Sequence, residues 1–158
     1  MKSRILWINA IVFLCLFNFM IFQKEGLLAS GKEVYLELVP LDPRSLLQGD
    51  YMSLRYRVAT QASLKNEGSE DGFIIAKIDS NQVGTFSRVA SAHDSVRPGE
   101  VKIKFRRRGS TVKIATDAFF FQNGKASQYS GAKYGIVKVG DEGDALLVGV
   151  ARTPGEKL

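Results

Sequence analysis

Residues 4–22 read RILWINAIVFLCLFNFMIF, and no other stretch of the 158-residue chain constrains its structure so strongly. From Ile5 to Phe22 there is no charged side chain, and the only strongly polar ones are Asn9 and Asn18. A hydrocarbon interior offers no hydrogen-bond partner to a peptide backbone, so an apolar stretch of about this length is stable there as a helix. We therefore predict one N-terminal transmembrane helix, an anchor over residues 1–23.

A cleaved secretory signal is the alternative interpretation of this segment. Lys2 and Arg4 form a basic start, and residues 27–29 (LLA) loosely resemble a cleavage site. The apolar stretch, however, exceeds the roughly 7–15 residues of an ordinary signal, and Leu27 is bulky where a small residue is preferred. Both features favour an anchor that stays on the chain.

The charges that flank the apolar stretch predict its orientation. Lys2 and Arg4 precede it, whereas Lys24 after it is next to Glu25. The positive-inside bias then leaves the N-terminus in the cytoplasm and sends the rest outward. In a bacterium this predicts a single-pass protein of the inner membrane, with a tether over residues 24–32 and a periplasmic domain over residues 33–158.

The exported part contains no cysteine, because the single cysteine, Cys15, lies within the apolar stretch. It therefore forms no disulfide and has no cysteine metal site. Its length suits one domain that is stable through a core of its own.

Alternating apolar and polar side chains predict strands through most of this domain. Val101, Ile103 and Phe105, for example, alternate with basic residues. A period of two marks a strand with one buried and one wet face. The predicted strands cover residues 34–38, 52–58, 73–79, 83–89, 101–105, 111–116, 134–139 and 145–150, with a helical turn over residues 59–65. About eight short strands predict a mainly β fold, a small antiparallel barrel or sandwich.

Glycine-containing turn signals separate these strands. Gly109-Ser110 predicts a tight hairpin that pairs Phe105 with Ile114. Asn123-Gly124 and residues 141–144 (DEGD) are further turn signals.

The most distinctive soluble segment is residues 39–56, VPLDPRSLLQGDYMSLRY. Pro40 ends a strand, because proline cannot donate to a sheet ladder. Asp42-Pro43 opens one turn and Gly49-Asp50 makes another. In the strand that follows, we expect Leu54 and Tyr56 to belong to the core.

This segment resembles the signature Gly-Asp-Tyr-x-x-Leu-x-Tyr of the GDYXXLXY family of bacterial membrane-anchored proteins. The matching residues are Gly49, Asp50, Tyr51, Leu54 and Tyr56. The C-terminal part is also similar to the family, at residues 119–122 (FFFQ), Tyr129, residues 132–135 (AKYG) and residues 145–150 (ALLVGV). Where the family usually has arginine before the glycine, this chain has Gln48. The resemblance implies an exported domain on one helix, often encoded beside multi-span membrane proteins.

We predict a partner-binding surface on the same segment. Its candidate residues are Asp42, Arg44, Gly49, Asp50 and Tyr51. The charged side chains suit a polar groove, and the ring and hydroxyl of Tyr51 suit recognition of another chain. The simpler alternative is structural: Gly49 satisfies the backbone, each aspartate caps a turn, and Arg44 pairs with one of them.

No catalytic residue, cofactor or metal site is predicted. His93 is the only histidine, which excludes a histidine cluster. Ser91, His93 and Asp94 are neighbours in sequence, whereas the groups of a triad converge from separate parts of a fold. A Ser–Lys hydrolase would need a lysine base, but Lys102 and Lys104 are expected on a wet strand face.

Basic side chains gather in the predicted hairpin and account for part of the net charge of +6. The candidate basic surface consists of Lys102, Lys104, Arg106, Arg107, Arg108 and Lys113. Strand alternation places Lys102, Lys104 and Arg106 on one face, with Lys113 near Arg106. Anionic lipid headgroups lie within reach of a short tether, whereas nucleic acid does not suit the predicted compartment. An ordinary solvated sheet face that resists edge pairing is the simpler alternative.

Three functions stay open on these grounds. The first is a non-catalytic binding or accessory module that docks on a multi-span inner-membrane protein. The second is an envelope hydrolase in which Asp42 and Asp50 divide the acid and base roles. The third is a structural envelope protein with a basic, lipid-facing hairpin. The missing catalytic set favours the first.

Overall fold

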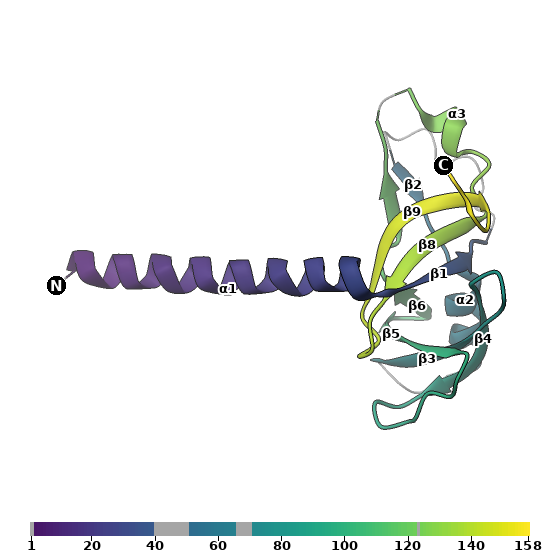
Figure 1. The fold of residues 1–158 in the computed structure, drawn as a ribbon, viewed down its shortest axis with the longest axis horizontal. Coiled ribbons are helices and arrows are strands. Elements are labelled where there is room, and N and C mark those ends of the chain that lie inside the picture. The colour runs from purple at the N-terminus through teal and green to yellow at the C-terminus, as the bar shows by residue number, and fades with distance from the viewer. Residues whose placement is uncertain (1, 40–50, 66–70, 123) are drawn as a thin grey trace.

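The computed structural model describes residues 2–39, 51–65, 71–122 and 124–158. One long helix, α1 (Lys2–Ser30), projects from a β-rich domain that lies across its C-terminal end (Figure 1). From Leu6 the helix is long and apolar enough to cross a membrane, and none of its apolar stretch is buried against the domain. The prediction of one N-terminal apolar helix is thus confirmed.

The helix continues through residues 24–30, where we expected a polar tether. The Gly31 N–H donates to the Leu27 carbonyl at 2.9 Å, which completes the last turn directly before the first strand. Leu27 packs on the domain, since a Cβ placed on Gly140 would lie 3.0 Å from the Leu27 side chain. The last turns of the helix are therefore in contact with the folded domain.

In the described residues, the domain contains two sheets and two short helices. The strands are β1 (Lys32–Glu37), β2 (Tyr51–Ser53), β3 (Asp71–Ile78), β4 (Val83–Ala90), β5 (Glu100–Arg108), β6 (Thr111–Ile114), β7 (Ala118–Phe120), β8 (Tyr134–Val139), β9 (Ala145–Thr153) and β10 (Glu156–Lys157). The helices are α2 (Arg57–Lys65) and α3 (Ala126–Tyr129). Eight strands form one sheet in the order β10-β9-β8-β1-β4-β3-β5-β6, and β2 pairs with β7 in a second, small sheet.

The predicted mainly β fold is confirmed, in its sandwich-like form. The described strands do not close a barrel, because β10 and β6 are the two edges of the large sheet. The pairs are antiparallel except β1 with β4, which run parallel. That pairing joins strands that a tight turn cannot connect, so no turn signal in the sequence indicates it.

The core lies between the large sheet and α2. Phe105, Leu36 and Ile74 are fully buried, and α2 adds Val58 and Ala62. In β5 the buried residues alternate with exposed Lys104 and Arg106, as the period of two predicted.

The predicted strand over residues 52–58 is wrong in its extent. Strand β2 ends at Ser53, and α2 begins at Arg57, where the Thr60 N–H already donates to the Tyr56 carbonyl at 3.1 Å. Leu54 and Tyr56 are buried as expected, with 5% and 3% exposed, but they lie in the connection between the two elements. Alternation alone could not distinguish this arrangement from a continuous strand.

The β5–β6 hairpin is confirmed in its register. Phe105 pairs with Ile114 and Arg106 with Lys113. Gly109 has φ +59°, the left-handed conformation that such a tight turn favours in glycine.

The large sheet curls, so that the turn between β8 and β9 reaches β5. The Lys104 N–H donates to the Gly143 carbonyl at 2.7 Å. This turn was predicted at residues 141–144, but its contact with β5 was not. It brings Asp144 beside the basic hairpin, at the base of α1.

Candidate functional site

The small β2–β7 sheet carries a cluster of aromatic side chains that we call the aromatic edge: Tyr51, Phe119, Phe120, Phe121 and Tyr129. Tyr51 pairs with Phe120 across the two strands, and their ring centroids are 5.8 Å apart. Tyr129 of α3 contacts the rings of Phe119 and Phe121, at 5.2 and 5.1 Å. Phe120 is 75% exposed, although the other members are half-buried.

The aromatic edge brings together the two parts of the chain that carry the resemblance to the family. Tyr51 comes from the Gly-Asp-Tyr signature, and the phenylalanines and Tyr129 come from the C-terminal segments. Of the predicted partner-binding residues, Tyr51 is the first residue of β2, whereas Asp42, Arg44, Gly49 and Asp50 lie outside the described residues.

Phe120 was missed as a functional candidate, although a signal was present. Successive side chains of a strand point to opposite faces, so three consecutive phenylalanines cannot all enter one core. Only the pairing of β7 with β2 shows that Phe120 is the one that faces solvent.

Tyr56, the last signature residue, is part of the core. Its ring packs over β8, where a Cβ placed on Gly135 would lie 2.9 Å from it. Its hydroxyl is buried without a hydrogen-bond partner in the described part of the chain. This burial, with a smaller contribution from the charge of Asp117, raises the pKa of Tyr56.

The second candidate site is a hollow of about 310 Å³ that we call the basic groove. Three elements line it: α1, the β5–β6 hairpin and the β8–β9 turn. Its lining residues are Lys24, Lys104, Arg106, Arg108, Lys113, Ala115, Asp144 and Ala145. Five cationic side chains thus face one carboxylate.

Among the described residues, most of this positive charge has no salt-bridge partner. Lys113 forms a salt bridge with Asp117 and thereby lowers the pKa of that carboxyl. Across the ranges that the structure describes, Lys104, Arg106 and Arg108 form no salt bridge. The arrangement suits an anionic ligand.

Two residues of the predicted basic surface lie apart from the groove. The Lys102 ammonium donates to the Ala92 carbonyl at 3.0 Å and lies 5.1 Å from the Phe73 ring centroid. The Arg107 guanidinium turns toward α2, where Nη2 lies 3.5 Å from the Ser63 carbonyl. Strand alternation explains why Arg107 points away from the groove, since it lies on the opposite face of β5 from Arg106. The local contacts of Lys102 could not be predicted from spacing.

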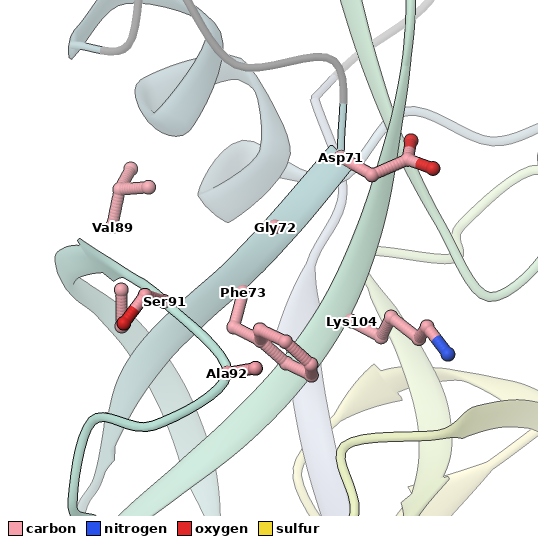
Figure 2. Close-up of a pocket in the computed structure, with 8 residues that line it drawn as sticks. Asp71, Gly72, Phe73, Val89, Ser91, Ala92 and Lys104 are labelled. Carbon is pink, nitrogen blue, oxygen red and sulfur yellow. The ribbon is translucent and has the colours of Figure 1, made fainter.

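A third hollow, of about 430 Å³, lies at the ends of β3 and β4 and shows no catalytic arrangement (Figure 2). Ser91 and Lys104 lie on opposite sides of Phe73, so they do not form a nucleophile–base pair (Figure 2). Asp94 accepts a hydrogen bond from the Ser91 N–H at 3.0 Å, which lowers the pKa of Asp94. His93 is exposed in the same loop.

In the ranges that the structure describes, candidate metal ligands are not clustered. No group of three or more histidine, cysteine, aspartate or glutamate side chains is close enough there to hold a metal ion. The carboxylates of the hydrolase hypothesis, Asp42 and Asp50, lie outside those ranges.

Comparison with known proteins gives one match. A family model described as GDYXXLXY protein matches residues 13–150, which is most of the chain. No curated protein and no solved structure matches.

Proposed function

The chain belongs to the GDYXXLXY family, and from this premise we propose that it is a non-catalytic binding or accessory module, anchored in the inner membrane, that docks on a multi-span membrane protein. Its N-terminus is cytoplasmic and its domain periplasmic. The apolar helix and the charges that flank it support this orientation.

The exposure of Phe120 is the observation that carries the proposal. Large aromatic side chains dominate the energetics of protein interfaces, and a 75% exposed phenyl ring beside Tyr51 is costly to leave in water. A single exposed apolar residue is common. Here, however, the Phe120 ring extends a cluster that contains Tyr51, the signature residue with which β2 begins.

The position of the aromatic edge suits a partner in the same membrane. The β2–β7 sheet lies at one end of the domain, to one side of the axis of α1 (Figure 1). A multi-span protein beside the anchor can therefore contact this edge and also the unburied face of α1. Asp42, Arg44, Gly49 and Asp50, which precede Tyr51 in sequence, are proposed to extend the same surface.

Site-specific photocrosslinking in native membranes tests the proposal. A photoreactive residue replaces Phe120 in the full-length chain, and the captured proteins are identified by mass spectrometry. Leu64 on α2 is the matched control position, because it is apolar and 78% exposed but lies on another element.

We expect one multi-span protein to be captured from position 120 and not from position 64. Tyr51→Ala in the same chain should reduce that capture at least ten-fold, the effect of truncating a central interface aromatic. Equal capture from both positions, or capture of no membrane protein from position 120, would refute docking through this edge.

A further inference from the structure

We propose that the basic groove binds the phosphate of an anionic lipid headgroup in the membrane that α1 crosses. This inference rests on the anchoring role of α1, but not on partner docking at the aromatic edge.

The position of Lys24 along α1 determines where the groove lies relative to the membrane surface. The apolar stretch ends at Phe22, and at 1.5 Å per residue Lys24 follows about 3 Å further along the helix. The headgroup layer on each side of the hydrocarbon is roughly 5–8 Å thick, so Lys24 lies within it. Because Lys104, Arg106 and Arg108 line the same groove as Lys24, they reach this layer as well.

The charge of the groove matches a phosphodiester. Lys113 is paired with Asp117, and Asp144 is the one acidic residue of the lining, which leaves several cations without a protein partner in the described ranges. Arginine presents parallel N–H groups that fit two phosphate oxygens at once. Arg106 and Arg108 are therefore the expected direct ligands, with Lys24 and Lys104 as flanking charges.

The wall formed by α1 favours a lipid over a soluble anion. On one side the groove is bounded by a helix whose preceding turns are apolar and unburied. A lipid places its acyl chains along those turns while its phosphate enters the groove. A soluble phosphate compound would gain only the charge contacts.

Native mass spectrometry of the full-length chain in detergent tests the inference, with phosphatidylglycerol and phosphatidylcholine of equal chain length as probes. We compare Lys104→Gln/Arg106→Gln/Arg108→Gln with Lys77→Gln/Lys125→Gln/Lys133→Gln. The control removes the same charge from three exposed lysines outside the groove. A basic side chain at a charged leaflet changes binding by roughly five-fold, so the groove variant should lose on the order of a hundred-fold in phosphatidylglycerol binding. The control should stay within about two-fold of the unmodified chain.

The single variant Lys24→Gln distinguishes a loss of lipid binding from a folding defect in the triple variant. This residue is exposed on α1, outside the β domain, and its replacement should weaken phosphatidylglycerol binding by roughly five-fold. Glycerophosphoglycerol, the headgroup without acyl chains, is the third probe. If it binds as tightly as the lipid, the ligand is a soluble phosphodiester and the lipid assignment is wrong.

Equal binding of the two lipids by the unmodified chain, or equal losses in groove and control variants, would overturn the proposal. Capture from position 120 is independent of these results, so failure here is distinguishable from failure of the docking proposal.

Discussion

Tyr56 combines deep burial with an unsatisfied hydroxyl. Its ring fills the space above Gly135, but the hydroxyl has no hydrogen-bond partner in the described part of the chain. A buried polar group without a partner costs about 1–3 kcal/mol, whereas the ring itself contributes to the core. The fold therefore uses the aromatic body of this signature residue and gains no stability from its polar end.

Tyr56→Phe should consequently stabilise the domain by about 1 kcal/mol, because it removes the desolvation cost and keeps the packing. Chemical denaturation of the full-length chain measures the change in the free energy of unfolding. Tyr35→Phe is the matched control: that residue is also buried, but its hydroxyl donates to Glu33 at 3.2 Å, so its removal should be neutral or destabilising. A clear loss of stability in Tyr56→Phe would show that the hydroxyl has a partner after all.

For single residues, the sequence predicted burial better than exposure. Leu54 and Tyr56 were assigned to the core because alternating apolar residues share a face, and both are buried. Phe120 was not recognised, since its exposure depends on which strand β7 pairs with. That pairing joins residues 51–53 to residues 118–120, and nothing local in either segment indicates it.

Among the elements, β4 and the start of β5 are joined by a bidentate ion pair. The Arg88 guanidinium donates to the two Glu100 oxygens at 2.7 and 3.2 Å, and the Arg97 N–H donates to the same carboxylate at 3.1 Å. The Glu100 side chain is only 10% exposed. The bonds from Arg88, and then that from Arg97, lower the pKa of Glu100 from its usual 4.5.

This shift predicts how the stability depends on pH. A carboxyl whose pKa is lower in the folded state stabilises the fold fully above its unfolded value, and loses that contribution as the pH falls through the folded value. The melting temperature of Glu100→Gln should thus be below that of the unmodified chain at pH 6, and the gap should shrink as the pH falls from about 4.5 toward 3.

Thermal melts at pH 6 and pH 3 measure this gap. Glu156→Gln is the control, because its pair with Arg152 is half-exposed and exposed pairs contribute little. A gap of constant size across this range would contradict the role given to Glu100.

Elements set by local signals were predictable, and elements set by distant contacts were not. The β5–β6 hairpin has its predicted register because Gly109 allows one tight turn. The parallel β1–β4 pair and the extension of α1 to Ser30 depend on packing between segments far apart in sequence. The basic groove could be predicted only in part. Its hairpin was predicted from the sequence, but the residues that α1 and the β8–β9 turn contribute became apparent only from the folded structure.

On the scale of the whole molecule, the helix and the domain have different roles. The helix has the length and apolar surface to cross a bilayer. The β2–β7 sheet, which carries the aromatic edge, lies to one side of the helix axis (Figure 1). The basic groove lies where Lys24 of α1 meets the β5–β6 hairpin. Both proposals depend on the same arrangement, in which α1 stays on the chain and the domain lies outside the cytoplasm.

Protease accessibility in spheroplasts of the expressing bacterium, read out by intact mass, tests that arrangement most directly. Protease added outside should digest the domain and leave a membrane-embedded fragment that still begins at residue 1. A chain that is fully protected, or one recovered without its first two dozen residues, would contradict the account.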